Sequence, residues 1–250
     1  LVKRWVKIQA GPAGLFSASP ELVRHLDCPA FRISHLPFHS TPSYTLNHLT
    51  ASPTMASIRA NCRKIMCIGR NYACGVSVHY EVELGLVIGK TVRDLDPQDE
   101  QGALDAIQSY ILAIDMTGRN VQDEAKKKGL PWSIAKGFDT FLPISQEIAK
   151  SRIPNPHDAF LRLHVGKNER QADSTSLMLY RIPQQLAHIS RIMTLEKGDI
   201  VLTGTPKGVG QVHAGDVMRA TIEVGGKEIE EGRIEVEVQD REGPYEFKET

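Results

Sequence analysis

The sequence predicts an α+β fold that is mainly β, with many short strands and few helices. Short apolar runs of about four to eight residues end at glycine or polar turn residues, as buried strands do. Few segments place apolar residues at the helical spacing of three to four. Strands and helices also do not alternate regularly, which argues against a doubly wound α/β fold.

Length and composition predict one soluble catalytic domain. The chain has 250 residues, enough for a substantial core. Its 30 basic and 30 acidic side chains balance, so we expect neither a nucleic-acid partner nor an anionic membrane surface. No apolar run approaches the ~20 residues that span a bilayer. The four cysteines lack C-x-x-C or zinc spacing and are interpreted as reduced structural thiols.

Residues 1–60 differ in composition from the rest of the chain. Arginine and lysine outnumber acidic residues there, among scattered serines, histidines and prolines. Such a segment is typical of a mitochondrial presequence, although a leader without a targeting role has the same composition. We therefore expect residues 1–60 to be a poorly ordered leader and residues 61–250 to be the catalytic domain. A mitochondrial location follows from the first interpretation, and a cytoplasmic one is the alternative.

The first elements of the domain are predicted to be strands. Residues 65–68 form an apolar run ended by Gly69, and residues 82–88 and 110–114 have a similar character. Residues 91–102 are polar and predict a loop or the start of a short helix.

The remaining elements follow from periodicity and turn residues. Residues 121–128 predict a short helix ended by Gly129, because acids precede bases along it. Residues 161–165 alternate and precede Gly-Lys-Asn, which predicts a hairpin. A second helix is indicated by Ile182, Leu186, Ile189 and Met193. A strand at 200–202, a glycine-rich loop at 203–210 and a hairpin at 217–238 around Gly225-Gly226 complete the prediction.

The most informative residues are three acids. On a strand, Glu81 and Glu83 share one face while Val82 and Leu84 face the core. Two carboxylates on one face repel each other unless a cation lies between them, and oxygen ligands favour Mg²⁺, Mn²⁺ or Ca²⁺ over zinc. Asp115 follows the apolar run 111–114, a position suited to a cleft. A solvated sheet face remains the alternative interpretation of the glutamates.

Two basic residues are further candidates. Lys136, if it is partly desolvated near a cation, has the chemistry to manage a proton, although a surface lysine after a helix is the simpler interpretation. Arg119 offers a planar fork for a carboxylate, or forms only an ion pair. The loop 204–210 lacks the order of glycines and lysine that defines a P-loop, so a phosphate-binding role is disfavoured.

Five ordered segments resemble motifs of the fumarylacetoacetate hydrolase family, most closely its acylpyruvase and oxaloacetate decarboxylase branch. They are G-R-N-Y at 69–72, H-Y-E-V-E-L-G at 79–85, D-M-T-G-R-N-V-Q at 115–122, L-P-W-S-I-A-K-G-F-D at 130–139 and L-T-G-T-P-K-G-V-G at 202–210. Together they span about residues 64–238. The resemblance implies the family's mixed β-sandwich roll, of the C-terminal domain type, and a homodimer.

The resemblance also implies roles for individual residues. Glu81, Glu83 and Asp115 would ligate Mg²⁺ or Mn²⁺. The other implied contacts are Arg119 and Gln122 with substrate oxygens, Thr205 with the substrate carboxylate, and Lys136 beside the reacting carbonyl.

The chain departs from the family pattern between Tyr72 and His79. Hydrolytic members carry a histidine and a glutamate in this region that activate water, followed by a lid, whereas here only six residues intervene. The hydrolytic base is therefore in doubt. His79 is a substitute candidate, and touching the metal site or simple packing are its alternatives.

The functional prediction is a metal-dependent acylpyruvate hydrolase, an oxaloacetate decarboxylase, or both, acting on small 2-oxo acids. An oxaloacetate or 2-oxo acid tautomerase of the same family is the first alternative, because enolisation needs no activated water. The second is a truncated paralogue without catalysis, serving as a dimeric binding subunit.

Overall fold

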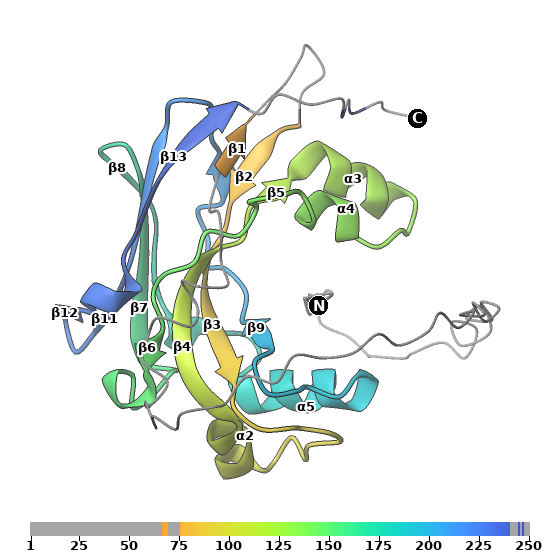
Figure 1. Ribbon diagram of the computed structural model, residues 1–250, viewed down its shortest axis with the longest axis vertical. Helices are drawn as coiled ribbons and strands as arrows, with labels where there is room; N and C mark the ends of the chain where they lie inside the picture. Colours follow the sequence, from red (N-terminus) through yellow and green to blue (C-terminus); the bar gives the residue numbers. More distant parts are fainter. Residues whose placement is uncertain (1–66, 70–75, 241–244, 246, 248–250) are drawn as a thin grey trace, which may run out of the picture. The chain divides into compact units, whose positions relative to one another are not determined.

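Three β-sheets make up most of the secondary structure of the computed structural model, which describes residues 67–69, 76–240, 245 and 247 (Figure 1). The leader predicted for residues 1–60 lies outside the described residues, as do residues 72–75 of the shortened segment before His79. The prediction of a mainly β fold is confirmed, and no strand set closes into a barrel within the part of the chain that is described.

The largest sheet has the strand order β1-β13-β11-β7-β8, with β12 paired to β11. Its strands are β1 (Cys67–Gly69), β7 (Ala159–Val165), β8 (Asn168–Ser174), β11 (Val217–Val224), β12 (Lys227–Glu228) and β13 (Ile234–Asp240). The two predicted hairpins are confirmed, since β7 pairs antiparallel with β8 and β11 pairs antiparallel with β12 and β13. Gly225 and Gly226 both have positive φ in the tight turn between β11 and β12, which favours glycine.

Two smaller sheets carry the acidic motif. The four-stranded sheet has the order β6-β4-β3-β9, and the three-stranded sheet has the order β10-β2-β5. Their strands are β2 (Val78–Tyr80), β3 (Val82–Ile88), β4 (Ile107–Ile114), β5 (Thr117–Gly118), β6 (Ile148–Ala149), β9 (Ile200–Leu202) and β10 (Gly210–Gln211). The predicted strand at 82–88 is confirmed, and the one predicted at 110–114 begins earlier.

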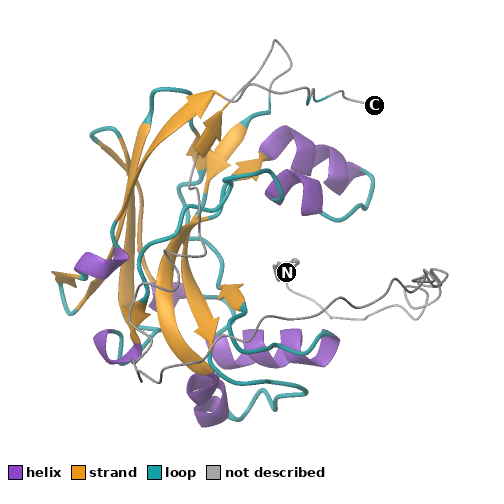
Figure 2. Cartoon of the chain, in the orientation of Figure 1, coloured by secondary structure: helices purple, strands orange, loops and turns teal. Residues whose placement is uncertain are grey.

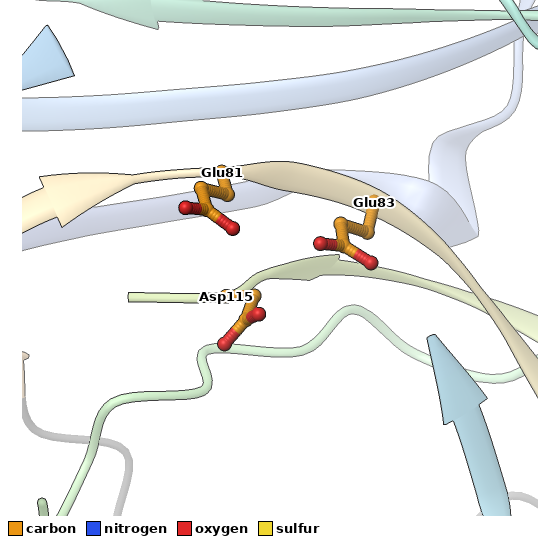
Figure 3. Close-up of side chains that lie close together, drawn as sticks. All are labelled: Glu81, Glu83 and Asp115. Carbon is orange, nitrogen blue, oxygen red and sulfur yellow. The ribbon is translucent and has the colours of Figure 1, made fainter. Parts of the chain in front are cut away.

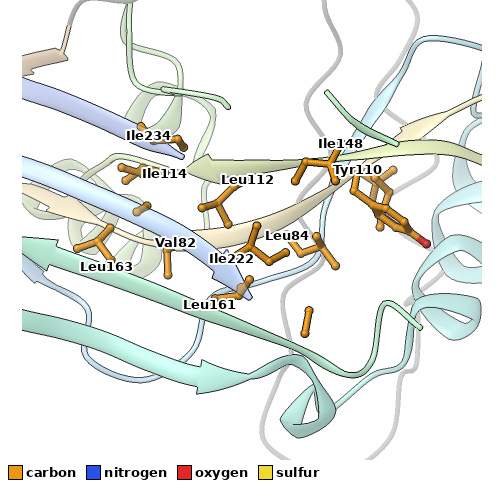
Figure 4. Close-up of a cluster of buried hydrophobic side chains, with 14 of the residues drawn as sticks. Val82, Leu84, Tyr110, Leu112, Ile114, Ile148, Leu161, Leu163, Ile222 and Ile234 are labelled. Carbon is orange, nitrogen blue, oxygen red and sulfur yellow. The ribbon is translucent and has the colours of Figure 1, made fainter. Parts of the chain in front are cut away.

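The main core lies between the large sheet and the β3–β4 pair (Figure 4). Even-numbered residues of β3, and of β4 from Tyr110 onward, face it, and alternate residues of β7 and β11 meet them from the other side. Buried members include Val82, Leu84, Leu112, Ile114, Leu161, Leu163 and Ile222. Each large aliphatic side chain buried in this way stabilises the fold by about 1.5–3 kcal/mol. The odd-numbered residues of β3 therefore face away from this core.

Few helices accompany the sheets (Figure 2). They are α2 (Glu100–Ala106), α3 (Arg119–Lys127), α4 (Ser133–Lys136) and α5 (Ile182–Ile192), with 3₁₀ turns η2 (Lys150–Arg152), η3 (Thr175–Leu177) and η4 (Glu230–Gly232). The helix predicted at 121–128 is confirmed but begins at Arg119. The polar segment predicted as a loop or helix start becomes α2 from Glu100 onward. Among the described residues, no helix has the length and apolar character needed to cross a membrane.

Candidate active site

Glu81 lies at a break between two strands. β2 ends at Tyr80 and pairs with β5 and β10, whereas β3 begins at Val82 and pairs with β4 and β9. The strand geometry assumed for both glutamates is thus interrupted at Glu81, where the chain changes sheets, although Glu81 and Glu83 still meet. A matching break follows β4, where Asp115 separates it from β5. The two breaks lie side by side.

The three predicted acids converge at this junction. Glu81, Glu83 and Asp115 each offer one carboxylate oxygen, and these oxygens all lie within 4.8 Å of one another (Figure 3). All three residues are buried, with exposed fractions of 4%, 0% and 6%. The solvated-face interpretation of the glutamates is thus wrong. Buried carboxylates at this separation repel one another strongly unless cationic groups compensate them.

Lys136 supplies part of that compensation. Its Nζ donates to Glu81 Oε2 at 3.0 Å and to Asp115 Oδ2 at 2.7 Å. Only 14% of its side chain is exposed, so the interpretation as a surface lysine is wrong. Lys136 is the last residue of α4, and this short helix turns its side chain toward the strand break.

Arg119 and Gln122 form a second arm of the site on α3. Arg119 Nη2 donates to Glu81 Oε1 at 2.8 Å, and Nη1 donates to Gln122 Oε1 at 2.5 Å. The two residues are three apart on one helix, which brings their side chains together. Gln122 is buried, with 2% exposed. The structure places both beside the acidic cluster, and their contacts with substrate remain a prediction.

Two further residues contact the carboxylates and were not predicted from sequence. Thr117 Oγ1 donates to Glu81 Oε1 at 3.1 Å and accepts from Lys136 Nζ at 2.5 Å. Gly204 N donates to Glu83 Oε2 at 2.6 Å. Thr117 could have been predicted from the sequence, because it lies two residues after Asp115 and its side chain projects to the same side of an extended segment. The contact of Gly204 with Glu83 could not have been predicted, because it depends on a backbone φ of 99° that the sequence does not reveal.

His79 lies beside the acidic cluster without being a member of it. Its Nε2 is 3.1 Å from Ser77 Oγ, and it pairs with Thr117 across β2 and β5. Burial, together with the nearby Arg119 guanidinium, lowers the pKa of His79 below its ordinary value of 6.5, although Glu81 opposes the effect. A role for His79 as a base therefore stays a prediction.

Thr205 lies on the loop between β9 and β10, directly after Gly204. Its Oγ1 accepts a hydrogen bond from Gln171 Nε2 at 2.9 Å. Because Gly204 contacts Glu83, this backbone connects the predicted carboxylate-binding threonine to the acidic cluster. Gln171, from β8, is another residue that the sequence did not single out.

The donor set fits a hard divalent cation. Three carboxylates converge without a thiolate or an imidazole among them, and Mg²⁺ and Mn²⁺ prefer such oxygen ligands. A divalent cation bound among the three carboxylates would offset their mutual repulsion, as Lys136 and Arg119 do in part.

Comparison with known proteins identifies the family to which this fold belongs. The model of the fumarylacetoacetate (FAA) hydrolase C-terminal domain matches residues 37–238. The chain belongs to the fumarylacetoacetate hydrolase family. The resemblance drawn from the motifs is thereby confirmed, as is the expected fold type.

Curated relatives share nearly half of the aligned residues. The mitochondrial oxaloacetate tautomerase oaa1 of Schizosaccharomyces pombe is 44% identical over 194 residues, covering 64% of this chain and 88% of that protein. The human mitochondrial oxaloacetate tautomerase FAHD1 is 48% identical over 146 residues, covering 58% of this chain and 65% of that protein. The chain thus spans just under two thirds of the human relative.

Solved structures of family members have a similar fold. A yeast fumarylacetoacetate hydrolase family protein has a TM-score of 0.68 and 41% identity, with 74% of this chain and 76% of that chain covered. Fumarylpyruvate hydrolase from Pseudomonas aeruginosa, in complex with Mn²⁺ and pyruvate, has a TM-score of 0.62 and 29% identity, with 70% and 72% covered.

Proposed function

We propose that this chain is a divalent-metal-dependent oxaloacetate tautomerase, which interconverts the enol and keto forms of a small 2-oxo acid. The observation that carries the proposal is the buried cluster of Glu81, Glu83 and Asp115 with the Lys136 amine within hydrogen-bond distance of two of the three. The names of the curated relatives support the same reaction.

The cluster would hold Mg²⁺ or Mn²⁺, which supplies Lewis-acid stabilisation to an enolate oxygen when it is bound. Lys136 is the group suited to move a proton to or from the substrate, because its amine lies at the edge of the cluster. The Arg119 guanidinium suits a planar carboxylate, and Thr205 would hold the carboxylate end of the substrate. Gln122 keeps Arg119 oriented.

Tautomerisation only relocates one proton between carbon and oxygen, so it consumes no water. It therefore needs no water-activating histidine and glutamate, and the short segment between Tyr72 and His79 does not count against it. From sequence, acylpyruvate hydrolysis or oxaloacetate decarboxylation is the first prediction, with tautomerisation as its alternative. The similarity to fumarylpyruvate hydrolase gives hydrolysis some support, but the tautomerase alternative is better supported by the relatives.

The proposal is tested by following the ultraviolet absorbance of enol oxaloacetate with purified protein and Mg²⁺ or Mn²⁺. We expect the enol to disappear faster than in buffer, and chelation of the metal to remove the acceleration. A parallel assay measures pyruvate release from acetylpyruvate. Pyruvate release without tautomerisation would favour the hydrolase, and neither activity would favour a non-catalytic binding subunit.

We also propose that the protein is mitochondrial and forms a homodimer. The curated relatives are named mitochondrial, which supports a presequence in the leader, whereas the family match begins at residue 37, within the predicted 1–60 segment. Fractionation of cells that express a tagged chain tests this location. A homodimer is expected from the family resemblance, and light scattering of the purified protein would measure it.

A further inference from the structure

Gln171 is a buried amide in an otherwise polar strand. Within β8, all of which is described, it is the one buried residue, with 1% exposed. Its Oε1 accepts from Val82 N at 3.0 Å, and its Nε2 donates to Thr205 Oγ1 and to Pro206 O, both at 2.9 Å. One side chain from the large sheet thus connects the start of β3, next to Glu81, with the loop that carries Thr205.

These three partners fix the direction of every hydrogen bond. The Val82 N–H can only donate and the Pro206 carbonyl can only accept, so the amide oxygen must face Val82 and the NH₂ group must face the loop. One NH₂ hydrogen goes to Pro206 and the other goes to Thr205. Thr205 Oγ1 therefore accepts from Gln171, and its own hydroxyl hydrogen must point to another acceptor.

The loop that carries Thr205 is held in place against β8. Gly208 has a φ of +99°, and a Cβ at Gly208 would collide with the carbonyl oxygen of Arg170 and come within 3.3 Å of Gln171 Cγ. The backbone of the loop is therefore fitted closely against β8. At its other end, Gly204 N donates to Glu83 at 2.6 Å, so Thr205 is held between β8 and the acidic cluster.

We propose that Gln171 is a positioning residue that turns the Thr205 hydroxyl into a hydrogen-bond donor for the substrate carboxylate. This inference rests on the proposed function, in which Thr205 binds that carboxylate. A carboxylate accepts hydrogen bonds and donates none. The Thr205 hydroxyl can therefore bind it only if the hydroxyl hydrogen points into the site. Gln171 sets that direction from outside the site.

The test uses Gln171→Glu, which keeps an acceptor for Val82 but has no NH₂ group. The Thr205 hydroxyl would then donate its hydrogen bond to the new carboxylate and have none left to donate to the substrate. Calorimetry of the Mn²⁺-loaded protein with pyruvate measures the outcome. We expect about a tenfold or greater loss of pyruvate affinity, the size expected when a hydrogen bond to a charged group is lost. With oxaloacetate as substrate, KM should rise far more than kcat falls.

Thr205 variants separate this effect from the added negative charge. In a Thr205→Ser background the hydroxyl remains, and Gln171→Glu should again weaken pyruvate binding about tenfold. In a Thr205→Val background there is no hydroxyl to redirect, so the same substitution should have little further effect. An equal loss in all three backgrounds would show a charge or folding effect and overturn the inference.

Gln185→Glu is a matched control for placing a carboxylate near this loop. Gln185 is also buried, and its Nε2 donates to the carbonyl oxygens of Tyr180 and Thr203. This control should lower the melting temperature without weakening pyruvate binding, and equal weakening by both substitutions would contradict a specific role for Gln171. If Gln171→Glu does not fold, Gln171→Met replaces it. A thioether neither donates to Thr205 nor accepts strongly from it, so the Thr205 hydroxyl is left without a fixed direction and a smaller loss of pyruvate affinity is expected, again only in backgrounds that keep the hydroxyl.

The two proposals fail in different ways. If the unmodified protein with Mn²⁺ binds no pyruvate, the proposed function fails and the Gln171 inference fails with it. If the unmodified protein binds pyruvate and Thr205→Val weakens binding while Gln171→Glu does not, the inference alone is overturned.

Discussion

The backbone N–H of Asp115 donates to the carbonyl oxygen of Glu81 at 2.7 Å. This bond joins the two strand breaks, because Glu81 separates β2 from β3 and Asp115 separates β4 from β5. Two carboxylates are thereby held on neighbouring strands at the point where both strands change sheets. Glu83 lies two residues further along β3 and projects to the same side (Figure 3). The metal centre proposed here depends on this backbone junction.

Glu83→Gln is expected to weaken Mn²⁺ binding by at least about tenfold, since changes even to groups that only support metal ligands commonly cost that much. The amide oxygen can still accept from Gly204 N, so the fold should persist. Titration of Mn²⁺ followed by electron paramagnetic resonance measures the affinity. Glu235→Gln is the control, because Glu235 forms an exposed ion pair with Arg219. Equal metal affinity in both variants would remove Glu83 from the ligand set.

Lys136→Met should reduce tautomerase turnover by about 10²–10⁴-fold, the usual contribution of a positioned acid or base. Methionine keeps an unbranched side chain only one atom shorter than that of lysine, but it has no group that exchanges a proton. Lys128→Met is the control, because Lys128 pairs with Glu124 at a partly exposed helix end. Stopped-flow measurement of enol loss compares the two. Turnover of Lys136→Met within a factor of about two of the unmodified protein would exclude a proton-transfer role.

Gly204→Ala is expected to destabilise the fold by about 1–2 kcal/mol, because alanine is strained at the positive φ of 99°. Nothing lies within 4 Å of the added Cβ, so the effect comes from the backbone alone. Gly204 N also binds Glu83, and we therefore expect weaker metal binding as well.

Gly215→Ala is the matched control for the glycine substitution. Gly215 has a φ of 89° and equally open surroundings, but its N–H donates to Val238 O, away from the acidic cluster. Both alanine variants should lose similar stability in urea unfolding, and only Gly204→Ala should lose metal affinity. Loss of affinity in both would point to general destabilisation.

His157 is expected to make the stability of the fold depend on pH. It is buried, and its Nε2 accepts from Ile182 N at the first residue of α5. Burial, aided by Arg181 and opposed by Glu100, lowers the pKa of His157 below its ordinary value of 6.5. A lowered pKa favours the neutral form in the folded state, so the stabilisation is complete above pH 6.5 and is lost as pH falls from there through the folded pKa.

Melting temperatures from about pH 8 to about pH 5 measure this effect. His157→Gln keeps an acceptor for Ile182 N but does not titrate, so its melting temperature should fall less with acidification than that of the unmodified protein. Parallel curves for the two proteins would show that His157 does not contribute. His79 also has a lowered pKa and remains in both proteins, so only the difference between the curves is interpreted.

Alternation along the chain predicts part of the site. It places Glu81 and Glu83 on one side with Val82 and Leu84 on the other, and this holds even though the strand is broken at Glu81. Local patterns do not reveal the break itself, because it arises from pairing with strands that are distant in sequence. Family resemblance added Lys136, which is 55 residues from Glu81.

Gln171 shows why the other residues around the site could not be predicted from the sequence. β8 reads N-E-R-Q-A-D-S, which has no apolar alternation to mark an inward side. Its burial results from the loop after β9 folding back over β8, and each of its partners lies at least 34 residues away. Polar residues buried by tertiary contacts leave no periodic signal in the sequence.

The interleaving of Val82 and Leu84 with Glu81 and Glu83 also restricts how this segment can change during evolution. Inserting or deleting one residue directly ahead of Val82 would exchange the two sides of β3, moving Glu83 into the core and aliphatic side chains toward the acidic cluster. Folding and chemistry would be lost in one step. Changes by two residues preserve the side on which each group lies, so length variation here is expected to occur in even steps.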